Sequence, residues 1–264
     1  MSALTATIAG IGFWTDGLPD SDAATAFARD GVRPDTAPAR PAPQLLAPNE
    51  RRRAPGSVAV ALEVALAACR AADRDPATLP SVFASTHGDL AITDYMCETL
   101  ATDPTAVSPT KFHNSVHNAA AGYWTIGAGC TEAATAISAF DGTFAQGLLE
   151  AVTQLATGSE AVLLVGYDVH GTGPLADVAA SAGLLGGALL LSRDAKPGRP
   201  QLRVALQDHD DAAPAPAGHR LADLFGGNAM APMLPLFEAL ALEQPAATLL
   251  AGPGRWLKLE LDHD

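Results

Sequence analysis

The chain has 264 residues, of which 48% are hydrophobic and 17% are charged, and its formal net charge at pH 7 is −13. The length and composition are typical of a globular protein with a sizeable core, in one large domain or two small ones. A charge this negative disfavours binding to nucleic acid and to anionic membrane surfaces. No apolar run approaches the roughly 20 residues of a membrane span and the N-terminus lacks a basic leader, so we expect a soluble cytoplasmic protein.

The first hundred residues contain predicted strands and helices in alternation. Residues 4–13 are a predicted strand, 34–48 a proline-rich loop, 58–72 a helix, 81–85 a strand and 89–101 a helix. Residues 107–114 are predicted to form a loop that leads into a further helix from residue 118.

The most informative stretch is residues 118–168, which begins with that helix. Small and β-branched residues predict a strand over 131–138. A helix is then predicted by apolar residues at helical spacing up to Gly158, namely Phe144, Leu148, Leu149, Val152 and Leu155. Residues 161–166 are almost entirely apolar, which predicts a strand covered on both faces. Together these elements form a predicted βαβ unit.

The turn between that strand and helix carries Asp141, followed by Gly142 and Thr143. At a sharp strand-to-helix turn the first helical residues face a pocket, where free N–H groups and the helix dipole favour negative charge. A thiolate would be activated there, whereas Asp141 is only stabilised as an anion.

The remaining elements are shorter. Strands are predicted at residues 186–192 and 201–207, an acidic and proline-rich linker at 208–217, and a helix at 233–242. A final hairpin turns at residues 251–254 and ends in an alternating run from Trp256 to Leu261.

Residues 118–126 carry a family resemblance. The segment reads Asn-Ala-Ala-Ala-Gly-Tyr-Trp-Thr-Ile. It resembles the Asn-x-x-Ala-Gly-x-x-Ser-Ile of the β-ketoacyl synthase branch of the thiolase fold. Counting on without a gap places the nucleophilic cysteine of that family on Asp141. Residues 83–90, 164–168 and 186–192 are also similar to the family, so the resemblance covers roughly residues 5–195.

The resemblance implies an α/β fold of the layered α/β/α thiolase type with a truncated second half. Residues 1–195 would be the ketosynthase-like N-terminal half, and residues 196–264 a reduced C-terminal segment with a linker, a helix and a hairpin. Two catalytic histidines of the family belong to the second half, which is mostly missing. His170-Gly-Thr-Gly copies one histidine motif and Phe225-Gly-Gly-Asn resembles a glycine-rich loop, but we interpret both matches as accidental.

The function implied by the resemblance is that of a catalytically silent subunit without a cofactor. The chain is similar to the small chain-length factors of aryl-polyene-type systems, which pair with an active ketosynthase in type II fatty acid or polyketide synthesis. An acyl carrier protein is usually acidic and would be repelled by this chain, so it should dock mainly through the partner. The acyl chain length and the partner's identity stay open.

Two groups of residues follow from this resemblance. The strand before the turn should pair across a two-fold axis, because an unpaired apolar edge is otherwise an aggregation hazard. The expected interface residues are Thr131, Ala133, Thr135, Ile137 and Phe140. The expected acyl-pocket residues are Phe112, His113, His117, Tyr123 and Trp124. For Tyr123 and Trp124, a place in the core is an equal alternative.

Asp141 has three possible roles in this scheme. It is an inert replacement, a helix-capping anion that fixes the turn, or a group that assists the partner as an acid, a base or an orienting residue. We favour the capping role.

Two other functions are compatible with the sequence. The first is a free-standing acyltransferase or hydrolase that uses Cys130 with His170 or His117. We otherwise interpret Cys130 as a small core residue in a reduced compartment, where three cysteines form no disulfide framework. The second is a non-enzymatic acyl-binding homodimer. A metal site at His113 and His117, four residues apart, is not expected because no third ligand follows.

Overall fold

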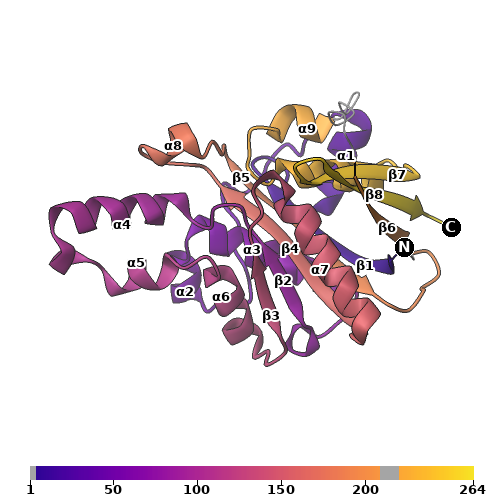
Figure 1. Cartoon of the computed structure of the whole chain (residues 1–264), viewed down its shortest axis with the longest axis horizontal. Coiled ribbons are helices and arrows are strands. Elements are labelled where there is room, and N and C mark those ends of the chain that lie inside the picture. Colours follow the sequence, from indigo (N-terminus) through magenta and orange to yellow (C-terminus); the bar gives the residue numbers. More distant parts are fainter. Residues whose placement is uncertain (1–3, 209–219) are drawn as a thin grey trace.

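Eight strands form one mixed sheet in the order β3-β2-β4-β5-β1-β6-β8-β7, within residues 4–208 and 220–264, which the computed structural model describes (Figure 1). The strands are β1 (Leu4–Thr15), β2 (Ser81–Ala84), β3 (Ala134–Ile137), β4 (Ala161–Val169), β5 (Leu184–Ser192), β6 (Gln201–Asp208), β7 (Ala246–Gly252) and β8 (Arg255–Asp262). Strand β2 runs parallel to both β3 and β4, and the other pairings are antiparallel. The carboxyl ends of β2, β3 and β4 therefore meet at one end of the sheet.

Helices cover both faces of this sheet (Figure 1). They are α1 (Ser21–Asp30), α2 (Pro48–Arg53), α3 (Gly56–Ala71), α4 (Leu90–Thr102), α5 (Pro109–Asn114), α6 (Ala119–Ala128), α7 (Thr143–Thr157), α8 (Leu175–Val178), α9 (Arg220–Phe225) and α10 (Leu234–Ala241). Helices α4 and α5 project from the sheet as an arm (Figure 1). Within the described ranges, no helix has both the length and the apolar character that a membrane span requires.

Helix α3 lies unusually close to strand β1. A Cβ atom added at Gly12 would lie 2.0 Å from the carbonyl oxygen of Val64, and one at Gly10 would lie 2.1 Å from that of Ala68. Only glycine fits at such an approach of two backbones. The alanine-rich inner face of α3 thus builds one of the two hydrophobic cores, together with α6.

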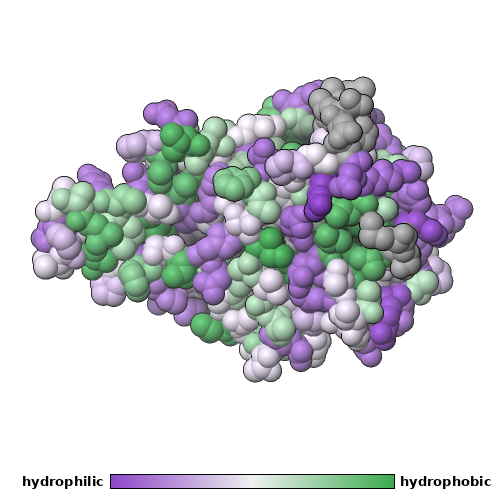
Figure 2. All heavy atoms as spheres, viewed as in Figure 1, coloured by the Kyte–Doolittle hydropathy of each residue, from purple (hydrophilic) through white to green (hydrophobic). Residues whose placement is uncertain are grey.

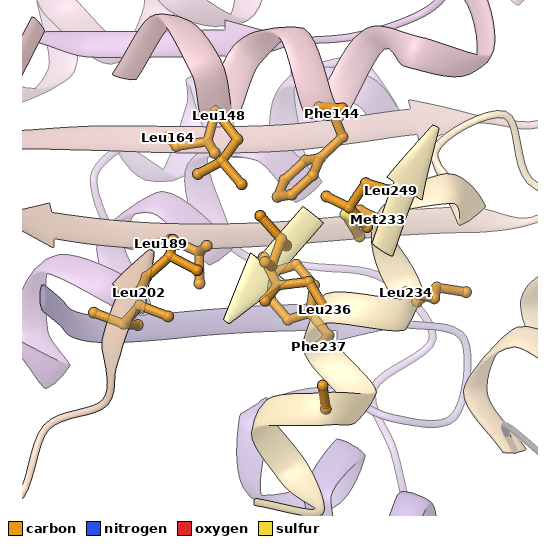
Figure 3. Packing of buried hydrophobic residues seen from close by; sticks show 14 of the residues in the cluster. Phe144, Leu148, Leu164, Leu189, Leu202, Met233, Leu234, Leu236, Phe237 and Leu249 are labelled. Carbon is orange, nitrogen blue, oxygen red and sulfur yellow. The ribbon is translucent and has the colours of Figure 1, made fainter. Parts of the chain in front are cut away.

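The second core lies between the sheet and the helices α7 and α10 (Figure 3). Phe144 and Leu148 of α7 point toward Phe237 of α10, and the rings of Phe144 and Phe237 are 6.0 Å apart. The predicted periodicity of α7 is confirmed, because its apolar residues face this core.

The sheet curls around α7. Strands β3 and β7 are the two edges of the sheet, yet β7 contacts the 3-10 turn Phe140–Gly142 that follows β3. A Cβ atom at Gly142 would lie 2.9 Å from the backbone of Ala251. The curl therefore brings the C-terminal hairpin against the strand-to-helix turn.

The predicted division at residue 195 falls in the connection between β5 and β6. Beyond it, β6, β8 and β7 continue the same sheet, because β6 pairs with β1. The two predicted segments stay a prediction. The predicted linker at 208–217 lies outside the described residues, except for Asp208 at the end of β6.

Two predicted elements differ from the structure. Residues 109–114, expected as part of a loop, form helix α5, because the Ser108 hydroxyl accepts a hydrogen bond from the Lys111 N–H and Pro109 occupies the first helical turn. The strand expected over 131–138 is shorter, and β3 spans Ala134–Ile137. Helix α1 was not predicted, although Asp20 caps its first turn and Gly31 ends it.

Candidate functional site

The turn after β3 contains a residue in the left-handed region of backbone conformation. Phe140 has a φ of +49°, and its side chain is 82% exposed. Bulky residues rarely adopt this conformation, and nucleophile elbows place the nucleophile at the strained residue of such a turn. By this criterion the elbow position belongs to Phe140, one residue before the Asp141 obtained by gapless counting. Neither side chain offers a thiol or a hydroxyl to an acyl group.

Thr143 fixes the backbone of this turn. Its buried Oγ1 accepts a hydrogen bond from the Ala139 N–H at 2.9 Å and donates one to the Phe140 carbonyl at 2.6 Å. The Gly142 N–H also donates to the Ala139 carbonyl. The left-handed conformation of Phe140 is held by these bonds on both sides.

The capping role expected for Asp141 is wrong. Neither the 3-10 turn nor helix α7 has a side-chain hydrogen bond at its N-cap, and the α7 N-cap is Gly142. The side-chain hydrogen bonds at this turn come instead from the Thr143 hydroxyl, which binds the Ala139 N–H and the Phe140 carbonyl. Asp141 is exposed in the first turn, where the helix dipole still favours its charge.

A buried polar network lies behind the turn, at the carboxyl ends of β2 and β4. Asp168 is fully buried and accepts hydrogen bonds from the Ser85 hydroxyl at 2.7 Å, the Thr86 N–H at 2.9 Å and the His87 N–H at 3.2 Å. Burial raises the pKa of Asp168, and these hydrogen bonds offset part of that effect. Sequence reasoning did not single out this carboxylate, although it follows an apolar strand directly.

This network connects to the turn itself. The Ser138 hydroxyl donates to the Thr86 carbonyl at 3.0 Å, and the Thr86 hydroxyl lies 3.4 Å from that of Thr143. His117 donates from Nε2 to the Ser85 carbonyl at 2.7 Å. The loop after β2 therefore links Asp168 to the turn that carries Phe140.

The sequence model of one protein family, described as beta-ketoacyl synthase, N-terminal domain, matches residues 28–220. This chain belongs to that family. The match confirms the resemblance predicted from residues 118–126. A search of curated proteins finds no match.

Solved structures share the fold. The complex of the ketosynthase ApeO with its chain length factor ApeC from Xenorhabdus doucetiae matches with a TM-score of 0.76 at 22% identity, over 97% of this chain and 99% of that chain. AntDE:AntF, a type II acyl-carrier protein in complex with its ketosynthase, matches with a TM-score of 0.74 at 10% identity, over 100% of both chains. Identities this low establish the fold, and the predicted thiolase-like class is confirmed.

A longer relative is matched only in part. A beta-ketoacyl synthase from Burkholderia phymatum STM815 matches with a TM-score of 0.58 at 11% identity, over 92% of this chain but 71% of that chain. The chain thus matches members of ketosynthase complexes from end to end, and spans only part of this synthase.

Cys130 does not lie where a catalytic cysteine would need to be. It is buried, and its Sγ lies 3.5 Å from the Leu79 carbonyl, beside the amino end of β3. His170 follows the carboxyl end of β4, where it is exposed beside an open depression of about 440 Å³. Strands β3 and β4 both run parallel to β2, so these residues lie at opposite ends of the sheet. The predicted pairing of Cys130 with His170 is therefore wrong.

The pairing of Cys130 with His117 fails for the same reason. His117 contacts the carbonyl of Ser85, which follows the carboxyl end of β2. Cys130 precedes β3, which is parallel to β2, and so lies at the opposite end. A buried thiol without a nearby base is not activated as a nucleophile.

The candidate pocket residues do not share one environment. Trp124 is fully buried in the core beside Phe83, with ring centroids 6.3 Å apart, which supports its core interpretation. Tyr123 is half-buried and lies edge-on to His113, at 5.8 Å. Phe112 is 60% exposed on the arm of α4 and α5, where Figure 2 shows apolar side chains at the surface. Within the described ranges, no group of three or more metal-ligating side chains is found.

The predicted interface residues lie along an edge of the sheet. Strand β3 pairs only with β2 among the described residues. Thr131 and Ala133 are exposed before the strand, and Thr135 and Ile137 are half-exposed within it. Sequence reasoning missed Ile126, which is 80% exposed on α6 near the amino end of β3. This surface stays a predicted interface.

Proposed function

We propose that this chain is a chain-length-factor-like subunit that pairs with an active β-ketoacyl synthase in a type II fatty acid or polyketide system of the aryl-polyene kind. The partner's cysteine would hold the acyl chain as a thioester, and the partner would carry out the decarboxylative condensation. This chain would hold no covalent intermediate. It would shape the acyl cavity from the other side of the interface.

The observation that carries this proposal is the composition of the turn after β3. A ketosynthase needs a nucleophilic thiol at its elbow, and both candidate positions here, Phe140 and Asp141, lack one. The end-to-end match to a complex that contains a chain length factor supports the same conclusion. An acyl carrier protein is a partner in a second matched complex, and we propose that it docks mainly on the ketosynthase here too.

The exposed edge of β3 supports pairing with a second subunit. Two edge strands related by a two-fold axis perpendicular to the sheet run antiparallel. The amino end of β3, with Thr131, Ala133 and Ile126, would then lie opposite the carboxyl end of the partner's strand. In this arrangement these residues border the partner's reaction centre and contribute the wall of the acyl cavity.

The test is co-expression with a cysteine-bearing ketosynthase, followed by sizing of the purified material. We expect a stoichiometric complex in which an acyl thioester labels only the ketosynthase. A complex that fails to form would contradict the proposal and would leave the non-enzymatic homodimer. A labelled acyl adduct on this chain would show that it carries a nucleophile.

A further inference from the structure

We propose that Phe140 is an aromatic docking anchor, which crosses the interface and packs against the end of the partner's α6 helix, beside its connection to β3. This inference rests on the proposed function, since it names the contact by which the two subunits join. The elbow residue would then bind the partner subunit, where the elbow residue of an active ketosynthase holds the acyl chain.

The backbone of Phe140 is strained in a way that needs a reason. The left-handed conformation is unfavourable for any residue with a Cβ atom, and more so for a bulky residue. Such residues persist where the surrounding structure determines their conformation, and they cluster at functional sites. With a φ of +49°, Phe140 meets this description.

The surroundings of Phe140 do determine its conformation. Thr143 bonds the backbone on both sides of it, as described above. Gly142 abuts the backbone of Ala251, and the Gln146 amide donates to the Ala251 carbonyl at 2.6 Å. The turn is therefore clamped between α7 and the C-terminal hairpin. A clamped backbone fixes the direction of the Phe140 Cα–Cβ bond, which lowers the backbone entropy lost on binding.

The ring itself has no comparable partner within the described part of the chain. It is 82% exposed and stands beside an open groove of about 620 Å³, whose mixed lining includes the apolar Ile137, Leu149 and Pro253 as well as polar side chains such as Gln146 and Glu150. Exposed aromatic residues beside other apolar side chains are typical anchors of protein interfaces.

The position of the Phe140 ring indicates that the surface it contacts belongs to the partner subunit. The two large apolar residues with the highest exposure next to β3 are Phe140 at its carboxyl end and Ile126 near its amino end. Antiparallel pairing of two β3 edges places the carboxyl end of one strand beside the amino end of the other. Phe140 then faces the partner's counterpart of Ile126, in continuity with the proposed strand pairing.

This inference is tested by measuring the affinity of variants of this chain for the ketosynthase that binds the native chain. We expect Phe140→Ala to raise the Kd about ten- to hundredfold, the effect of losing one buried aromatic side chain. Phe140→Leu keeps an apolar anchor and should lose less. Val32→Ala is the matched control, because Val32 is also exposed, at 57%, but follows α1, which packs on α9 and α10. Its Kd should stay within about twofold of the native value.

Two results would overturn the inference. One is an unchanged Kd for Phe140→Ala while the native chain still binds, a result that leaves the proposed function intact. The other comes from a photoreactive phenylalanine analogue at position 140, read out by mass spectrometry of the native-like complex. Cross-links to the ketosynthase segment from the end of α6 to β3 support the anchor, and cross-links confined to this chain contradict it.

Discussion

The side-chain amide of Gln146 donates a hydrogen bond to the carbonyl of Ala251, with 2.6 Å between nitrogen and oxygen, and joins α7 to the C-terminal hairpin. The register of β7 with β8 shifts between Leu250 and Gly252, so Ala251 lies at the irregularity. Gln146 thus supplies a partner to a buried carbonyl where the strand pairing shifts.

Replacing Gln146 by Leu should destabilise the chain. The Ala251 carbonyl would stay buried without this donor, which lowers the free energy of unfolding by about 1–2 kcal/mol. Urea unfolding measures the change. Gln154→Leu is the control, because the Gln154 amide bonds only Glu150 within the same helix. Equal losses in both variants would contradict a special role for the contact between α7 and the hairpin.

Much of the fold can be predicted from local sequence pattern. The helical spacing of Phe144, Leu148 and Leu155 and the apolar run at residues 161–166 of β4 identify a βαβ unit without further information. The helix is buried on one face and the strand on both faces, and each kind of burial leaves a distinct spacing of apolar residues in the sequence. The similarity to solved structures then confirms the layered architecture that the resemblance implied.

The site was harder to predict, because its features arise from contacts between distant residues. Ala251 meets Gly142 only because the sheet curls, and no local pattern encodes that approach. The left-handed conformation of Phe140 has no sequence signal, since glycine or asparagine is expected there. The capping role assigned to Asp141 failed because Asp141 lies inside the 3-10 turn and Gly142 takes the N-cap position of α7.

Thr143 should be essential to the stability of the turn. Thr143→Val preserves shape but removes the hydrogen bonds of the buried hydroxyl, and we expect a loss of about 1–3 kcal/mol in the free energy of unfolding. Thr143→Ser keeps the hydroxyl and should lose about 0.8 kcal/mol, the contribution of one buried methyl group. Denaturant unfolding of the two variants compares them. A serine variant less stable than the valine variant would show that packing, rather than hydrogen bonding, fixes the turn.

The strain at Phe140 predicts an unusual order of stabilities. Phe140→Gly should be more stable than Phe140→Ala by about 1 kcal/mol, because glycine adopts the left-handed conformation without penalty. The same two substitutions at Phe112 serve as a control, for which we expect the opposite order of stability. Phe112 is also exposed, but it lies in helix α5, where alanine should exceed glycine by about 1 kcal/mol. Thermal and urea unfolding of the four variants measure the two stability differences. The same order at both positions would contradict a strained turn.

Asp168 predicts a dependence of stability on pH. Burial raises its pKa in the folded chain above the ordinary value of 3.8. The folded state therefore binds more protons than the unfolded state between 3.8 and the raised pKa. Stability contributed by the protonated group is fully present below 3.8 and declines as pH rises through this window.

Asp168→Asn isolates this effect, because the amide does not titrate. The difference in unfolding free energy, native minus variant, should fall as pH rises above 3.8 and become constant beyond the folded-state pKa. The variant also places an amide near the N–H groups of Thr86 and His87, which shifts the whole curve without changing its slope. Urea unfolding over a series of pH values gives the slope. A difference that grows with rising pH would mean that the three hydrogen bonds outweigh burial, and that the carboxylate is the favoured form in the folded chain.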